Sequence, residues 1–160
     1  MRSDAVRLMQ ALGLDTCELS LMIVDDPAMR ILNRRFRMKD RPTDVLSFPQ
    51  LDEHGDNYAV QTTRRPRTLL GDVVISMDTA LRQARRLRVA PAVRLRTLLI
   101  HGLLHLLGYD HERSPAEAQR MFARERELAA KLPQAMRAVG ARGALPRRRR
   151  RPRAARSASR

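Results

Sequence analysis

Residues 101–111 read His-Gly-Leu-Leu-His-Leu-Leu-Gly-Tyr-Asp-His, and this stretch decides the fold and the chemistry of the 160-residue chain. His101 and His105 are four residues apart, so a helix places both imidazoles on one face, about one turn from each other. Gly108 can end that helix in the left-handed conformation, and the chain can then bring His111 back toward the first two histidines. Three converging ring nitrogens with a fourth position open are typical of a catalytic zinc site.

The spacing H-x-x-x-H-x-x-G-x-x-H is that of the metzincin zinc peptidases, with one difference at the second position. Those enzymes carry a glutamate general base directly after the first histidine, and this chain has Gly102 there. The pattern therefore predicts the metal geometry without the peptidase base, which makes a zinc peptidase the least favoured function. Two histidines four residues apart are often core residues, but the third histidine after a glycine turn favours a metal site.

The composition favours a single intracellular domain. A chain of this length can bury a core, and it has no run of about 18 apolar residues, so we expect no membrane span. The first residues lack the apolar segment of a signal peptide, and Cys17 is the only cysteine, which excludes an internal disulfide. We expect a cytoplasmic protein whose zinc is held by histidine or carboxylate ligands.

The chain is strongly basic, with 32 lysines and arginines against 17 aspartates and glutamates. Residues 147–160 contain eight arginines and no acid, yet residues 1–146 still carry a net charge of +7. A net positive charge on residues 1–146 predicts a polyanionic partner, most often nucleic acid. A coding bias could explain the choice of arginine over lysine, but it does not explain the excess of base over acid.

The same features predict the domain organisation. We expect residues 1–133 to form a single metal-dependent hydrolase domain and residues 134–160 to form a basic, disordered tail. The tail has no large apolar residue after Leu145, so its last part cannot bury a core. It could tether the protein to RNA, or it could be an extension with no role.

Hydrophobic patterns predict an α+β fold. Strands are expected at 18–24, 43–49 and 69–76, and helices at 4–13, 26–35, 78–88, 90–107 and 115–132. Asp26 is expected to cap the second of these helices before Pro27. The buried stripe of that helix is expected to be Ala28, Ile31, Leu32 and Phe36. The prediction is a small mixed sheet of three to four strands packed with about five helices, one of them a zincin-like metal helix. The one long loop is expected at 50–67.

Three blocks of this sequence together resemble the YbeY family, which is described as metal-dependent endoribonucleases and also as rRNA maturation factors. The first is the histidine stretch at 101–111. The second is Leu-Asn-Arg-Arg-Phe-Arg at 32–37 with Thr-Asp-Val-Leu-Ser-Phe-Pro at 43–49, and the third is Leu-Gly-Asp-Val-Val-Ile-Ser at 70–76. The blocks occur in the family order, and the resemblance covers roughly residues 19–128.

This resemblance implies a single-strand-specific endoribonuclease that acts in 16S rRNA 3′-end maturation and in ribosome quality control. It implies one zinc ion per chain on His101, His105 and His111, and it points to Arg37 as a further active-site residue. Without the resemblance, Arg37 would be interpreted as the solvated end of a basic helix. The implied partners are ribosomal RNA and the small ribosomal subunit, with possible ribosome-associated proteins and no membrane.

Several roles stay open at the level of sequence. Asp110 could orient an imidazole or cap the turn after Gly108, and a role as general base is less favoured. Ser47 could face the cleft, Asp44 is expected to be a structural turn partner, and His54 is expected on the solvated surface. The alternative function is a ribosome-assembly factor that binds RNA, with a structural metal and no turnover.

Overall fold

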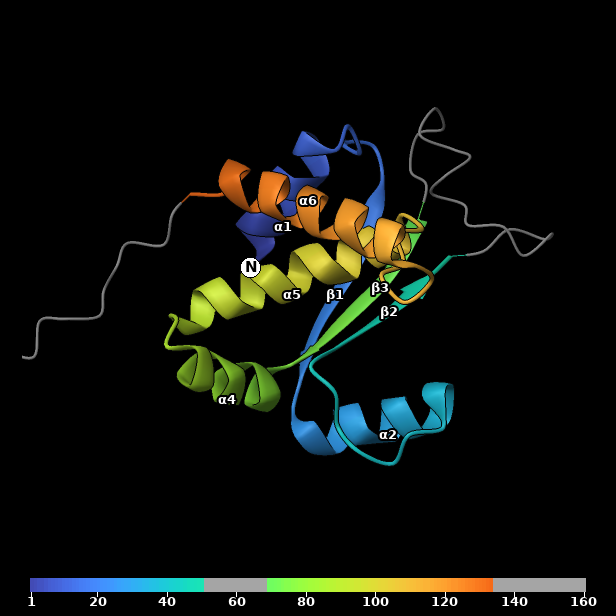
Figure 1. Ribbon diagram of the computed structural model, residues 1–160. Helices are drawn as coiled ribbons and strands as arrows, with labels where there is room; N and C mark the ends of the chain where they lie inside the picture. Colours follow the sequence, from blue (N-terminus) through green and yellow to red (C-terminus); the bar gives the residue numbers. More distant parts are fainter. Residues whose placement is uncertain (51–68, 134–160) are drawn as a thin grey trace, which may run out of the picture.

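The computed structural model describes residues 1–50 and 69–133, and it shows a mixed sheet surrounded by helices (Figure 1). The elements are α1 (Arg2–Ala11), β1 (Glu18–Val24), α2 (Asp26–Arg37), β2 (Val45–Pro49), β3 (Leu69–Ser76), α4 (Met77–Leu87), α5 (Pro91–Leu106) and α6 (Pro115–Lys131). Five helices and three strands in these residues confirm the predicted α+β class. The expected loop from residue 51 onward, with His54, and the expected tail at 134–160 lie outside the described residues.

β3 is the central strand of the sheet. It pairs in parallel with β1, where Leu21 is opposite Val73, and antiparallel with β2, where Ser47 is opposite Val73. The side chains of β3 alternate between the two faces, as a strand requires. Val73 and Ile75 belong to the main core, whereas Val74 belongs to a smaller cluster on the other face. Because both faces are covered, β3 is a nearly continuous apolar run.

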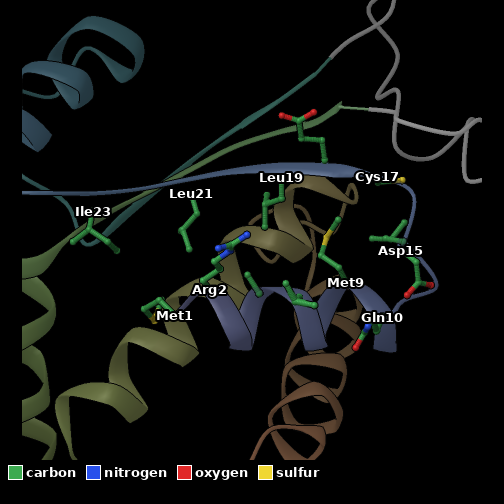
Figure 2. Close-up of a pocket in the computed structure, with 13 residues that line it drawn as sticks. Met1, Arg2, Met9, Gln10, Asp15, Cys17, Leu19, Leu21 and Ile23 are labelled. Atoms are coloured by element: carbon green, nitrogen blue, oxygen red, sulfur yellow. The ribbon is translucent and has the colours of Figure 1, made fainter.

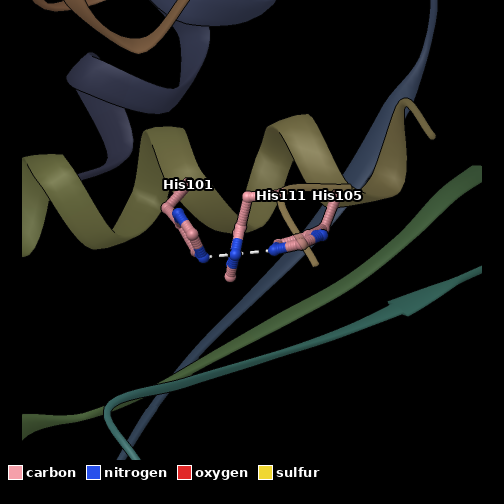
Figure 3. Close-up of side chains that lie close together, drawn as sticks. All are labelled: His101, His105 and His111. Carbon is pink, nitrogen blue, oxygen red and sulfur yellow. Dashed lines mark hydrogen bonds between the residues drawn. The ribbon is translucent and has the colours of Figure 1, made fainter. Parts of the chain in front are cut away.

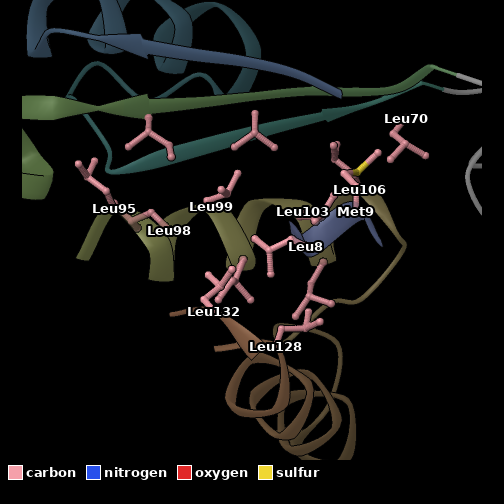
Figure 4. Close-up of a cluster of buried hydrophobic side chains, with 14 of the residues drawn as sticks. Leu8, Met9, Leu70, Leu95, Leu98, Leu99, Leu103, Leu106, Leu128 and Leu132 are labelled. Atoms are coloured by element: carbon pink, nitrogen blue, oxygen red, sulfur yellow. The ribbon is translucent and has the colours of Figure 1, made fainter. Parts of the chain in front are cut away.

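α5 lies across one face of the sheet, α6 packs against it on the side away from the strands, and α1 contacts both of these helices (Figure 1). It is apolar over most of its circumference, as expected for a helix that is buried on several sides. Figure 4 shows its leucines packed among side chains of α1, β3 and α6. Each fully buried leucine contributes roughly 1.5–3 kcal/mol of transfer free energy, so this cluster fixes the position of α5. No helix within 1–50 and 69–133 is long and apolar enough to cross a membrane.

Gly102 allows α5 to approach the sheet closely. A Cβ atom at this position would lie 2.8 Å from Cγ1 of Val73, closer than side-chain contacts normally come. The hydroxyl of Ser47 donates a hydrogen bond of 3.0 Å to the carbonyl oxygen of Gly102, and this bond joins β2 to the helix. The position that holds the catalytic glutamate in the peptidases is therefore a packing position here, facing the strands.

The predicted buried stripe of α2 was wrong for two of its four residues. Ile31 and Phe36 are 66% and 54% exposed, and the buried positions are Met29 and Asn33. α2 covers only the small cluster on the second face of the sheet, so only a narrow part of the helix surface is buried. Asn33 is buried because its amide donates a 2.7 Å hydrogen bond to the carbonyl oxygen of Arg41, which fixes the loop that follows the helix.

The predicted cap of α2 was displaced by one residue. The side chain of Asp25, not Asp26, accepts a 2.9 Å hydrogen bond from the backbone amide of Ala28 and so caps the helix. Asp26 instead connects α2 to the start of α4. Its carboxylate accepts hydrogen bonds from Ser76, Thr79 and Arg82.

Candidate metal centre

The three histidines of the decisive stretch converge on one point (Figure 3). One ring nitrogen from each of His101, His105 and His111 lies within 4.8 Å of the other two. The Nε2 atoms of His101 and His105 are 3.1 Å apart. In a tetrahedral zinc site with Zn–N bonds of about 2.0–2.1 Å, neighbouring nitrogens are about 3.3 Å apart. These three residues could therefore hold a metal ion.

The turn after α5 brings the third histidine into place. Gly108 has a φ of +86°, a left-handed conformation that glycine adopts without strain. The amide of Tyr109 donates to the carbonyl oxygen of Leu104 at 3.1 Å and closes the turn in the manner of a helix C-cap. The chain then reverses, and His111 lies beside the two histidines of α5. The predicted role of Gly108 is confirmed.

Asp110 stabilises this turn, and its side chain makes no hydrogen bond to an imidazole of the described residues. Its carboxylate accepts a 2.8 Å hydrogen bond from the amide of Glu112 and forms an ion pair with Arg113. Of the roles left open for Asp110, the structure supports the structural one.

The carboxylate that orients a histidine comes from α6. Oε1 of Glu125 lies 2.7 Å from Nδ1 of His101. Because an ionised carboxylate can only accept, Nδ1 carries the proton and Nε2 presents its lone pair to the other histidines. Sequence reasoning placed Glu125 on the last helix without assigning it a role. The available signal was its position between Met121 and Leu128, which makes it an acidic residue on the buried face of that helix.

His105 is suited to bind a metal in its neutral form. Burial lowers the pKa of its imidazole, and the positive charges of protonated His101 and His111 would lower it further. The nearby Asp110 charge and a hydrogen bond with the backbone of Tyr109 oppose this shift without reversing it. A lowered pKa keeps the ring deprotonated at neutral pH, as metal binding requires.

The three histidines line a cavity of about 580 Å³. Its walls come from the end of α2, from β2 and the residues before it, and from the turn after α5. Arg37 lies in this wall as the last residue of α2, and its side chain makes no hydrogen bond or ion pair with any other residue of 1–50 and 69–133. Ser47 also lines the cavity, but its hydroxyl is engaged with α5.

Asp44 lines the same cavity, yet its carboxylate has structural partners. Oδ2 accepts hydrogen bonds from Gln83 at 3.0 Å and from Arg94 at 3.1 Å, and Oδ1 accepts from the amide of Val45. Burial alone would raise the pKa of Asp44, but these bonds and the Arg94 charge outweigh burial and lower the pKa. Asp44 therefore joins the start of β2 to α4 and α5, which confirms its predicted structural role.

A larger cavity of about 810 Å³ lies between α1 and β1, on another part of the molecule (Figure 2). Most of its lining is apolar, with Met9, Leu19 and Leu21 among the side chains shown in Figure 2. Its ionisable groups do not converge, and none of the three histidines lines it. The smaller histidine cavity is therefore the candidate site.

Comparison with known proteins identifies the family. The family model for the endoribonuclease YbeY matches residues 3–133. This chain belongs to the YbeY endoribonuclease family. The resemblance of the three sequence blocks to YbeY is thereby confirmed.

Individual YbeY relatives are similar over most of the chain. The endoribonuclease YbeY of Anaeromyxobacter sp. (strain Fw109-5) is 50% identical over 129 residues, which are 81% of this chain and 62% of that protein. The YbeY of Aquifex aeolicus is 45% identical over 128 residues, 80% of this chain and 79% of the relative. This chain thus spans less than two thirds of the Anaeromyxobacter protein.

One solved structure shares the fold. The solution structure of TM1509 from Thermotoga maritima is 24% identical, with a TM-score of 0.57 over 81% of this chain and 77% of that one. In this YbeY-family chain, the histidine cluster is thus built on the expected α+β scaffold. The assignment of the three histidines as metal ligands, and of Arg37 as catalytic, remains a prediction.

Proposed function

We propose that this chain is a zinc-dependent, single-strand-specific endoribonuclease that acts in 16S rRNA 3′-end maturation and in ribosome quality control. The observation that carries the proposal is the convergence of His101, His105 and His111 beside Arg37 in one cavity of a YbeY-family chain. The relatives are named as endoribonucleases, and the strongly basic composition favours an RNA substrate.

The donor set fits one zinc ion per chain. Three imidazoles with a fourth position open are a known ligand set of catalytic zinc, and the Glu125–His101 hydrogen bond is the kind of support that such ligands usually have. When bound, the ion would act as a Lewis acid toward a phosphoryl oxygen or a water molecule.

The protein residues then have distinct roles. Arg37 lines the cavity, and the five N–H donors of its guanidinium have no partner among the described residues, so it can bind the phosphate that is being cleaved. Its charge would stabilise the extra negative charge of the transition state. Glu125 positions His101 and does not touch the substrate. Gly102 faces the sheet and leaves no room for the glutamate of a peptidase.

The proposed partners are ribosomal RNA and the small ribosomal subunit, together with proteins that accompany the ribosome in the cytoplasm. The net charge of +15 supports binding to this polyanion, because basic side chains release counterions from phosphates. We therefore expect the affinity for RNA to fall as the salt concentration rises.

Cleavage of a labelled single-stranded RNA by the purified, zinc-loaded chain tests the proposal. Arg37→Ala should lower kcat/KM by at least about a hundredfold, the size of effect seen when one donor to a transition-state charge is removed. His105→Ala should abolish cleavage and metal retention together. Arg34→Ala is the matched control, because Arg34 is an exposed arginine of the same helix outside the cavity.

Three outcomes are informative. Loss of activity in the Arg37 and His105 variants, with an active Arg34 variant, supports the proposal. Unchanged cleavage by both site variants would refute it. Tight, salt-sensitive RNA binding without any turnover would favour the alternative of an assembly factor with a structural metal.

A further inference from the structure

The chain has three phenylalanines and no tryptophan, and all three phenylalanines lie around the histidine cavity. Phe36 and Phe48 line it, and Phe122 packs in a stacked arrangement against His111 with ring centroids 6.1 Å apart. None of the three is fully buried: Phe36 is 54% exposed, Phe122 is 47% exposed, and Phe48 is half-buried. Phe48 packs against the small core cluster of Met29, Leu46 and Val74, whereas Phe36 and Phe122 belong to neither core cluster of the described residues.

Phe36 differs from the other two because its ring is held by neighbouring side chains and is still exposed to solvent. Its ring meets that of Phe48 edge to face, with centroids 4.9 Å apart, and the guanidinium of Arg35 lies 5.3 Å from its centroid. These contacts restrict the ring at the end of α2, directly before Arg37. More than half of the side chain remains accessible, although burial of an aromatic ring is favourable. An aromatic side chain that is fixed and exposed beside a phosphate-binding arginine resembles a binding surface more than a core residue.

We propose that Phe36 is a stacking platform for one unpaired nucleobase of the RNA substrate, next to the phosphate bound by Arg37. This inference rests on the proposed function and adds the element that recognises single strands. Every base has a π-face that can stack on an aromatic ring, so such a platform accepts many sequences. Bases inside a duplex are already stacked on their neighbours, so the platform selects for unpaired RNA.

The arrangement offers one contact to the phosphate and one contact to the base of a nucleotide. Arg37 offers donors to the phosphate, and Phe36, its neighbour in sequence, offers a ring to the base. The guanidinium of Arg35 lies over the Phe36 ring in a cation–π contact, which helps to hold the ring in place. Phe48 supports the platform from β2, which bonds to the histidine helix through Ser47. The platform is therefore connected through β2 to the helix that carries two of the histidines.

A fluorescence experiment tests the stacking directly. Because the chain has no tryptophan, Phe36→Trp introduces a single indole fluorophore at the proposed platform. We expect a short single-stranded RNA to quench this fluorescence in the binding phase, before cleavage. An abasic ribose-phosphate oligomer of the same length and charge should bind more weakly and leave the fluorescence unchanged. Ile31→Trp is the matched control, because Ile31 is 66% exposed on the same helix but does not line the cavity.

A second set of variants measures the effect on the reaction. Phe36→Leu keeps an apolar side chain but removes the ring, and we expect KM for single-stranded RNA to rise roughly 5- to 150-fold, as for the loss of one stacked base. Phe36→Tyr should restore most of the affinity. The thermal midpoint of Phe36→Leu should stay close to that of the wild type, since the side chain is largely exposed.

The outcomes separate this inference from the proposed function. Cleavage of RNA without any quenching of the indole in Phe36→Trp, or with an unchanged KM in Phe36→Leu, would overturn the platform and leave the endoribonuclease intact. Equal quenching by the abasic oligomer would also overturn it. If the wild type neither binds nor cleaves RNA, both ideas fail together.

Discussion

Replacing Glu125 provides a graded test of how the metal centre is held. Its carboxylate accepts a 2.7 Å hydrogen bond from Nδ1 of His101, and the two side chains are only 20% and 24% exposed. Glu125→Ala removes both the acceptor and the negative charge, whereas Glu125→Gln keeps an acceptor and removes only the charge. The two variants therefore separate the orientation of the imidazole from its electrostatic support.

The structure sets the expected size of the effect. A charge-assisted hydrogen bond contributes roughly 1.5–3 kcal/mol, and loss of such a partner typically weakens metal binding by about 10- to 100-fold. Because a fifth of the Glu125 side chain is exposed, water can replace part of the hydrogen bond, and we expect about tenfold weaker zinc binding for Glu125→Ala. The glutamine variant should lose roughly three- to fivefold, since neutral hydrogen bonds are about half as strong.

Competition for zinc against a chromophoric chelator at neutral pH measures these affinities. Glu127→Ala serves as a control, because Glu127 lies on the same helix but forms its ion pairs with Arg124 and Lys131. The reasoning is refuted if Glu125→Ala binds zinc as tightly as the wild type and the Glu127 control, or if the glutamine variant loses more than the alanine variant.

Three further predictions concern stability and metal loading. Gly102→Ala would place a Cβ 2.8 Å from the stiff Val73 side chain. Overpacking of this kind costs about 1–3 kcal/mol, whereas alanine gains up to about 1 kcal/mol in helix propensity. Urea unfolding should therefore show a lower free energy of unfolding for this variant than for the wild type. For Asp26, burial would raise the pKa, but hydrogen bonds from Arg82 and two hydroxyl groups lower it to about 2. The ionised Asp26 therefore stabilises the fold fully above about pH 4, the pKa of an aspartate in the unfolded chain, and this stabilisation is lost as the pH falls toward 2. Asp26→Asn should have a lower free energy of unfolding than the wild type above about pH 4. Urea titrations at stepped pH should show this difference disappear between about pH 4 and about pH 2. Zinc at a hundred times its Kd should raise the free energy of unfolding by about 2.7 kcal/mol, and a similar gain in His105→Ala would contradict the ligand assignment.

Sequence patterns predicted the elements well because the relevant signals are local. The three strands and the metal helix each have an apolar pattern and a capping or proline signal within a few residues. The histidine cluster was predictable for the same reason, since its three members and Gly108 lie within eleven residues. Gly102 was recognised as a missing base, but only the packing of α5 on Val73 explains why glycine is there.

The failures all involve contacts between distant segments. Ile31 and Phe36 have the spacing of a buried stripe, but α2 packs on a small part of one face, so the tertiary arrangement leaves them exposed. The choice between Asp25 and Asp26 as cap depended on partners about fifty residues away that engage Asp26. Glu125 could not be paired with His101 before the packing of α6 on α5 was known.

The positions of the histidines in the sequence separate metal retention from catalysis. All three come from one segment of eleven residues, so bringing them together closes only a short loop and costs little chain entropy. Arg37 and Phe36 come from α2, more than sixty residues earlier, and they reach the same cavity only when the sheet and its helices are assembled. A chain in which α2 has lost its contacts could therefore still bind its metal but no longer bind RNA. Mild denaturant should accordingly abolish cleavage at a lower concentration than it releases zinc.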